Sequence, residues 1–291
     1  MRVTNLFRQR GRGGLAIALA VAITSLVVPA HAVRAQPATQ TLVVCAPGSP
    51  GTTDEAQPRM DAFAHAVSAR AGTPIAAVYE PSEPGGVKRL ATASIALVSL
   101  PFFLAHEREL GLRARLVAVA KGRPALERWA LVAQKGRVTS PAGLAGFTIV
   151  SPVAFAPAFL RGTVLGGFGA LPATTRLSQS TAVLSALRRA ANGEAVAVLL
   201  DGTQQAALAS LPFAAKLEVV ARSPALPAGL IATIDARLPA KSWPGISAAL
   251  LGLAADKASA AVLEGIQMSG FVALDDNVLA AARKAYADAP P

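Results

Sequence analysis

The stretch Ala195-Val-Ala-Val-Leu-Leu-Asp-Gly-Thr203 carries the pattern that decides the fold. Its first six residues are all apolar, which is typical of a strand that is buried on both faces. Asp201 or Thr203 can cap a helix predicted over Thr203–Ala209, because the side-chain oxygen of either residue accepts from a free backbone N–H group. The stretch therefore predicts a buried strand that turns into a helix at its carboxyl end.

Similar units fill the chain on both sides of this stretch. Ser180 or Thr181 can cap the preceding helix, and Asn192-Gly193 can end it in a left-handed turn. Pro101 suits the first turn of another helix. This alternation favours an α/β fold in which parallel sheets are covered by helices. The predicted strands are Thr41–Ala46, Ile75–Glu80, Ser94–Ser99, Arg115–Ala120, Trp129–Gln134, Phe147–Ser151, Thr174–Leu177, Ala195–Leu200, Leu217–Ala221 and Gly229–Ile234. The predicted helices are Glu55–Ala71, Gly86–Ala93, Pro101–Glu109, Ala156–Leu165, Thr181–Ala191, Thr203–Ala209, Pro244–Ala255, Ala258–Gln267 and Asp276–Ala287.

At two places one predicted strand follows another with no helix between them. Lys121–Pro124 breaks the chain at the first place, and Ser223–Pro227 breaks it at the second. We interpret both as crossings between two lobes. Lobe I is then predicted to comprise residues 36–125 and 225–291, and lobe II residues 126–224.

The first 35 residues have the order of a secretory signal peptide. Arginines up to Arg12 precede the apolar run Leu15–Val28, and Ala30-His-Ala32 or Val33-Arg-Ala35 offers a cleavage site. A membrane anchor is the alternative, although the run is shorter than the ~20 residues that span a bilayer. We therefore expect residues 1–35 to be removed and the mature chain to be soluble and periplasmic.

Charge and cysteine content exclude several classes of protein. Five of the 28 basic residues lie in the signal, so the remainder carries 23 basic and 17 acidic side chains, a formal charge of +6. These charges are dispersed, whereas a nucleic-acid protein more often shows a basic stripe with aromatic residues. The single cysteine, Cys45, excludes an internal disulfide and a Cys-based four-ligand metal site, and its apolar surroundings predict a buried, inert thiol.

Two stretches carry a resemblance to a known family. Ser140-Pro-Ala-Gly-Leu-Ala-Gly-Phe-Thr-Ile-Val150 follows the first crossing, and Val183-Leu-Ser-Ala-Leu-Arg-Arg-Ala-Ala-Asn-Gly-Glu-Ala-Val-Ala-Val198 lies deep in lobe II. With the export signal and the order of elements, they resemble the periplasmic solute-binding proteins of ABC transporters, in the type II, phosphonate-binding-protein-like group. The resemblance implies a two-lobed type II periplasmic-binding-protein fold, hinged by two crossover strands. It also implies capture of a small molecule, an organic anion among the candidates, for an inner-membrane ABC permease.

The sequence departs from this family at the start of lobe II's first helix. The phosphonate binders that this chain resembles have a cluster of small hydroxyl residues at this place, whereas this chain has Ser151-Pro-Val-Ala-Phe-Ala-Pro157. Hydroxyls and backbone donors are lost together, because proline has no N–H group. A less charged or more apolar solute, or no solute at all, fits this stretch better than phosphonate does.

Candidate ligand-binding residues are those that follow the predicted strands. Ligands of open α/β sheets bind outside the carboxyl ends of the strands, and hinge closure of two lobes traps them. Helix starts there also present N–H groups suited to an anionic group, although plain capping is the alternative for each residue. The candidates are Ser49, Ser99, Phe102, Ser151, Ser180, Thr181, Asp201 and Thr203.

Two further functions stay open at this point. The chain could be an accessory or sensor module of the same fold that contacts a partner protein, in which case its own side chains should fill the cleft. A thiol enzyme would need a solvent-reachable Cys45 or His106 beside a base, but Cys45 lies within a predicted strand. We expect a monomer that binds a small molecule and uses no cofactor, metal or nucleic acid.

Overall fold

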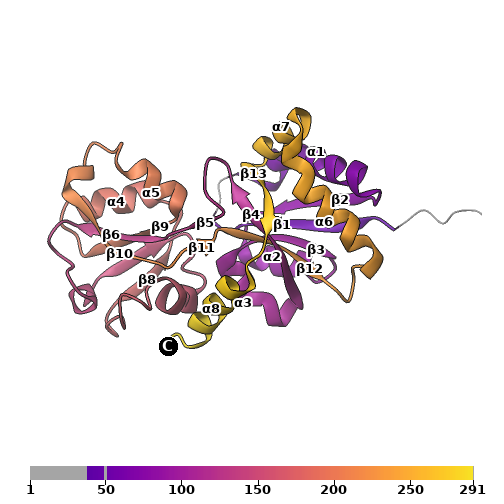
Figure 1. Cartoon of the computed structure of the whole chain (residues 1–291). Helices are drawn as coiled ribbons and strands as arrows, with labels where there is room; N and C mark the ends of the chain where they lie inside the picture. The colour runs from indigo at the N-terminus through magenta and orange to yellow at the C-terminus, as the bar shows by residue number, and fades with distance from the viewer. Residues whose placement is uncertain (1–37, 49–50, 291) are drawn as a thin grey trace, which may run out of the picture. The chain divides into compact units, whose positions relative to one another are not determined.

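The computed structural model describes residues 38–48 and 51–290, whose helices and strands are labelled in Figure 1. The predicted signal peptide, residues 1–35, lies outside the described residues. The strands form two large mixed sheets and one short two-stranded pair.

The first large sheet has six strands in the order β13-β4-β12-β3-β1-β2. β1 is parallel to β2 and to β3, whereas β12 is antiparallel to β3 and β4, and β13 is antiparallel to β4. The strands are β1 Gln40–Cys45, β2 Ile75–Glu80, β3 Ile95–Ser99, β4 Leu112–Ala120, β12 Gly229–Ile234 and β13 Met268–Ala273.

Helices cover both faces of this sheet, so successive residues of β1 are buried on opposite sides. Val43 and Cys45 pack in one core cluster with Phe102, and Leu42 and Val44 pack in another with Phe63. The second cluster is supplied by α1, α6 and α7, and the first by α2 and α3. The helices are α1 Thr53–Ala71, α2 Glu83–Leu90, α3 Leu100–Leu110, α6 Trp243–Gly252 and α7 Lys257–Gly265.

The second large sheet has five strands in the order β10-β6-β9-β7-β8. The parallel strands β8, β7 and β9 are joined by β6, which is antiparallel to both β9 and β10. Its elements are β6 Ala130–Gln134, β7 Thr148–Ser151, the π-helix η2 Phe159–Val164, β8 Arg176–Gln179, α4 Val183–Ala191, β9 Val196–Leu200, α5 Gly202–Leu208 and β10 Leu217–Arg222.

Two antiparallel strands lie on the chain segments that connect the large sheets (Figure 1). They are β5, Leu126–Glu127, and β11, Leu226–Pro227. Ser223 ties the segments together, because its N–H donates to the Trp129 carbonyl and its Oγ accepts from the Trp129 N–H, both at 2.9 Å. The two connections are therefore bonded to each other where they join β6 and β10 of the second sheet.

The C-terminal helix α8, Asp276–Ala287, contacts elements that flank both sheets. Arg283 donates to both carboxylate oxygens of Glu107 on α3 at 2.7–3.0 Å. Thr163 on η2 donates to the Ala282 carbonyl at 3.4 Å. One apolar core cluster also includes residues of both sheets, Val98 and Ile149 among them.

The structure corrects four features of the predicted fold. The sheets are mixed rather than parallel, because β6 and β12 each enter a sheet directly from a crossing and run against their neighbours. The strand β13 was not predicted, and the segment predicted as the helix Ala156–Leu165 contains a π-helix, in which the Leu165 N–H donates to the Leu160 carbonyl. The cap predicted at Ser180 or Thr181 was wrong, since α4 begins at Val183, two residues later than predicted, with Ala182 as its N-cap.

Candidate functional site

The carboxyl ends of strands from both sheets surround one cavity of about 190 Å³, which we call the intersheet cavity. Gly48 follows β1 and Ser99 ends β3 in the first sheet, and Pro152 and Asp201 follow β7 and β9 in the second. The remaining wall comes from the connecting segments, through Glu127, Trp129 and Ala228, and from Ala46, Pro47, Pro101, Ala120, Val153, Thr203 and Gln204.

Two carboxylates lie in this wall. Asp201 caps α5, since its Oδ1 accepts from the Gln204 N–H at 2.7 Å while the Gln204 side chain accepts from the Asp201 N–H. Glu127 is only 5% exposed and accepts from the Gly202 N–H, and its Oε2 lies 4.0 Å from Arg123 Nε. Both side chains therefore lie over the first turn of α5.

Burial changes how easily these two groups ionise. Desolvation raises the pKa of Glu127, and the nearby Asp201 raises it further, against the opposing effects of the Gly202 N–H and Arg123. Desolvation also raises the pKa of Asp201, against the N–H groups of Gln204 and Thr203. Among the described residues that line the cavity, these are the charged side chains, and none is a lysine, arginine or histidine.

Two of the lining residues each carry a polar atom that lacks a hydrogen-bond partner within the described part of the chain. These atoms are Trp129 Nε1 and Ser99 Oγ, both of which are buried. The Trp129 ring is held edge-on against Phe159, with centroids 5.5 Å apart. A buried polar group without a partner costs about 1–3 kcal/mol, and two of the residues that line this cavity carry such a group.

The structure brings three of the predicted site residues to this cavity, Ser99, Asp201 and Thr203. Ser49 lies outside the described residues, although its neighbour Gly48 lines the cavity. The other four do not line it. Phe102 is fully buried in the core beside His106, and Ser151 is buried with its Oγ accepting from the Val153 N–H at 3.4 Å. Ser180 and Thr181 follow β8 at the sheet edge, where Ser180 Oγ accepts from the Ala182 N–H.

Glu127 and Trp129 are cavity residues that the sequence analysis missed as ligand contacts. Trp129 was included only as the first residue of a strand, and Glu127 only within the range of lobe II, residues 126–224. Their position beside the predicted crossing was the available signal, because a hinge segment between two lobes must border the cleft.

The thiol of Cys45 is not placed for chemistry. It is fully buried, its Sγ donates to the Ser82 carbonyl at 3.6 Å, and burial raises its pKa to about 12.

Within residues 38–48 and 51–290, no group of three or more His, Cys, Asp and Glu side chains is arranged to hold a metal ion. In the same residues no single helix is long and apolar enough to cross a membrane, and the bent pair 240–255 and 257–265 passes by length and composition alone.

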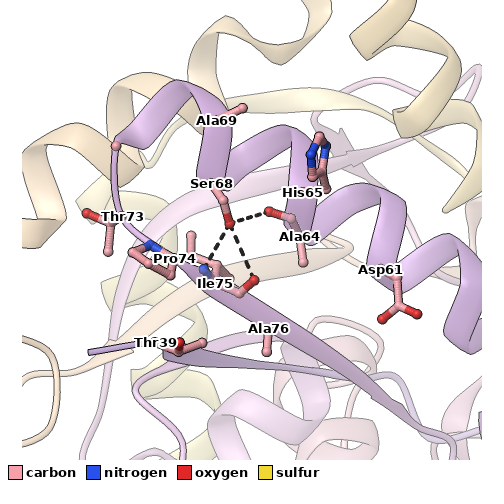
Figure 2. Close-up of a pocket in the computed structure, with 11 residues that line it drawn as sticks. Thr39, Asp61, Ala64, His65, Ser68, Ala69, Thr73, Pro74, Ile75 and Ala76 are labelled. Atoms are coloured by element: carbon pink, nitrogen blue, oxygen red, sulfur yellow. Dashed lines mark hydrogen bonds between the residues drawn. The ribbon is translucent and has the colours of Figure 1, made fainter. Parts of the chain in front are cut away.

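A second, wider hollow of about 690 Å³ lies where α1 ends and β2 begins (Figure 2). Figure 2 shows Ser68 at its centre, hydrogen-bonded to Ala64 and Ile75. His65 and Asp61 on its rim are exposed. This hollow adjoins the amino end of a strand and its central hydroxyl is already bonded, so the intersheet cavity is the better candidate.

Residues 50–279 match the family described as "ABC transporter, phosphonate, periplasmic substrate-binding protein". No curated protein sequence matches the chain.

Similar solved structures cover most of the chain. XAC2383 from Xanthomonas citri, bound to chloride, has a TM-score of 0.68 and 13% identity over 85% of this chain and 96% of its own. A binding protein component of an ABC phosphonate transporter from Pseudomonas aeruginosa, PA3383, has a TM-score of 0.58 and 17% identity, covering 84% of this chain and 83% of its own. PhnD1 from Prochlorococcus marinus, in complex with methylphosphonate, has a TM-score of 0.57 and 14% identity, covering 84% of this chain and 98% of its own.

At these identities the structural likeness establishes the fold, which is the predicted type II periplasmic-binding-protein fold. The family model matches most of the sequence, so it assigns the chain to a family, which the structural likeness alone does not do. The chain belongs to the phosphonate-type periplasmic substrate-binding proteins of ABC transporters, a family that captures small solutes for uptake.

Proposed function

We propose that this protein captures a small solute in the intersheet cavity and delivers it to an inner-membrane ABC permease. The observation that carries the proposal is the pair of buried, unpartnered polar atoms, Trp129 Nε1 and Ser99 Oγ, in one cavity wall. A solute with a hydrogen-bond acceptor would satisfy both atoms and remove the cost of leaving them unpaired. The cavity is open rather than filled by its own side chains, which favours solute capture over the accessory or sensor role.

The proposal includes a division into two closing lobes. Lobe I would take residues 36–125 and 225–291 and lobe II residues 126–224, with the β5–β11 pair at the hinge. Binding a solute between the lobes would stabilise the closed arrangement. We further propose a monomer that is exported to the periplasm by residues 1–35 and needs no cofactor.

Ligand copurification tests the proposal. The mature chain is purified from the periplasm under native conditions, and small molecules released by denaturation are identified by mass spectrometry. Released compounds are then added back in a thermal-shift titration. A binding solute should raise the unfolding temperature with its concentration, since a ligand of the native state stabilises it by mass action.

A matched pair of variants assigns the binding to the cavity. Trp129→Phe keeps an aromatic ring against Phe159 but removes the N–H group, whereas Trp243→Phe makes the same change at a tryptophan that does not line the cavity. The thermal shift should shrink in Trp129→Phe and persist in Trp243→Phe. Equal shifts in both variants would place the solute elsewhere and refute the proposed site.

A further inference from the structure

We infer that the solute carries a protonated amine, which the carboxylates of Glu127 and Asp201 bind, and that it is not a phosphonate. This inference rests on the proposed function, because it assigns a chemical class to the solute of the same cavity. It departs from the ligand that the similar protein from Prochlorococcus marinus binds in its solved structure, methylphosphonate.

The charge of the cavity wall is the first argument. Among the described lining residues, two are acidic and none is basic. Arg123 does not line the cavity, but its Nε lies 4.0 Å from Glu127 Oε2, and its positive charge favours the ionised form of both Glu127 and Asp201 and so offsets part of their charge. A phosphonate would bring its negative charges against these carboxylates in a poorly solvated space, whereas an ammonium group would be attracted to both.

The segment 152–154, which follows β7 at the cavity, has no free hydrogen-bond donors for an anion. Pro152 lines the cavity directly after β7, and proline has no N–H to offer. The neighbouring donors are already used, because the Val153 N–H bonds to Ser151 Oγ and the Ala154 N–H bonds to the Ser151 carbonyl. Ser151 itself is fully buried and bonded within its own loop, so this segment offers an anion nothing to bind.

The two unpartnered polar atoms, Trp129 Nε1 and Ser99 Oγ, would bind the uncharged part of the solute. Trp129 is 5% exposed. Its Nε1 has no hydrogen-bond partner among the described residues, and neither has Ser99 Oγ. A single N–H and a single hydroxyl suit one uncharged acceptor, such as an ether, hydroxyl or amide oxygen. The expected solute is therefore small, with an ammonium group at one end and a neutral acceptor within reach of Trp129 and Ser99.

Calorimetric titration with matched probes tests the inference. The cationic probes are ethanolamine, putrescine and choline, and the anionic probes are methylphosphonate, phosphate and acetate, all titrated near neutral pH into the purified mature chain. We expect at least one cationic probe to bind and every anionic probe to fail. Choline carries a positive charge but no N–H group, so its binding would show that charge alone is enough, and its failure beside a binding ethanolamine would show that N–H donors are needed.

Variants locate the charge that is recognised. Glu127→Gln and Asp201→Asn keep an oxygen acceptor for the N–H groups of Gly202 and Gln204, so the first turn of α5 keeps its bonds. Each should weaken the binding of the cationic probe at least tenfold. Glu194→Gln removes an exposed carboxylate that pairs with Arg189 and does not line the cavity, and it should leave binding unchanged.

The outcomes separate this inference from the proposed function. Binding of methylphosphonate or phosphate without any cationic probe would overturn the inference and leave solute capture standing. Cation binding that both Glu127→Gln and Asp201→Asn retain in full would overturn the assignment to these carboxylates. Failure of every probe in the wild-type chain would count against both the inference and solute capture.

Discussion

Gly48 and Pro152 lie against each other although they belong to loops of different sheets. A methyl group built on Gly48 would stand 2.5 Å from Cβ of Pro152, which is closer than two such carbons can approach. Both residues line the intersheet cavity, so this contact forms part of its wall. The two loops can meet in this way only because residue 48 has no side chain.

Replacing Gly48 by alanine should hold the two loops apart. The added methyl group meets Pro152, and Gly48 also has a φ of +86°, a conformation that costs an L-residue roughly 1–2 kcal/mol. We expect the affinity for the solute to fall about tenfold, equivalent to ~1.4 kcal/mol, because closure would be opposed. Calorimetric titration measures the affinity, and small-angle scattering measures whether the solute still compacts the chain.

Gly136→Ala is the matched control for this change. Gly136 has a similar φ of +78°, but no atom lies within 4 Å of the position that its new methyl group would take. It therefore reproduces the backbone strain without the contact. Equal affinities in Gly48→Ala and Gly136→Ala would show that the Pro152 contact has no role in closure.

The buried carboxylates predict a dependence of stability on pH. Folding raises the pKa of Glu127 above its usual 4.5 and that of Asp201 above its usual 3.8. The native state then binds more protons than the unfolded state, so the contribution of this pair is fully present below the usual values and is lost as pH rises through the raised ones. The two groups are neighbours and titrate as a pair.

Denaturant unfolding of the wild type and Glu127→Gln between about pH 4 and pH 7 measures this contribution. Glu80 and Asp235 have lowered pKa values and act in the opposite direction, so the quantity to follow is the difference between the two proteins. The variant should gain stability relative to the wild type as pH rises. A difference that stays constant with pH would mean that Glu127 has the same pKa in the folded and unfolded states.

Regular elements with a clear periodic pattern were predictable from sequence. The strand Ile75–Glu80 and the helix Asp276–Ala287 have their predicted bounds, and Asp201, one of the two predicted caps, is the N-cap of α5. The strand β13 escaped prediction because its Ser269-Gly270 interrupts the apolar run and makes a register shift against β4. The π-helix η2, which packs against α8, was predicted as an α-helix because composition does not distinguish the two.

The candidate site was predictable only in part, for a physical reason. Ser99 and Asp201 end or follow strands, and strand ends of one sheet gather at one edge without further information. Glu127 lies on a two-residue strand whose place is set by pairing with Leu226, about a hundred residues later in the chain. No local pattern encodes such a pairing, so the residue that contributes half of the cavity's charge could not be assigned from its neighbours in sequence.

The packing of α8 against η2 yields a prediction for stability. A methyl group on Gly162 would collide with the Ala285 carbonyl oxygen of α8. Gly162→Ala should therefore destabilise the chain by about 1–3 kcal/mol, the usual cost of overpacking, measured as a lower urea midpoint. In Gly167→Ala no atom lies within 4 Å of the new methyl group, so this control should change stability by less than about 1 kcal/mol.

The two tryptophans give a direct optical test of the cavity. The chain contains only Trp129 and Trp243, and Trp243 lies at the start of α6 beneath the guanidinium of Arg115. In Trp243→Phe the remaining emission comes from Trp129, and a solute that accepts from its Nε1–H should shift that emission. In Trp129→Phe the shift should vanish and the affinity should fall about two- to tenfold, which corresponds to one neutral hydrogen bond of ~0.5–1.5 kcal/mol. If emission from Trp243 alone follows solute binding, the solute does not sit against Trp129, and the orphaned indole N–H would then be only a cost of folding.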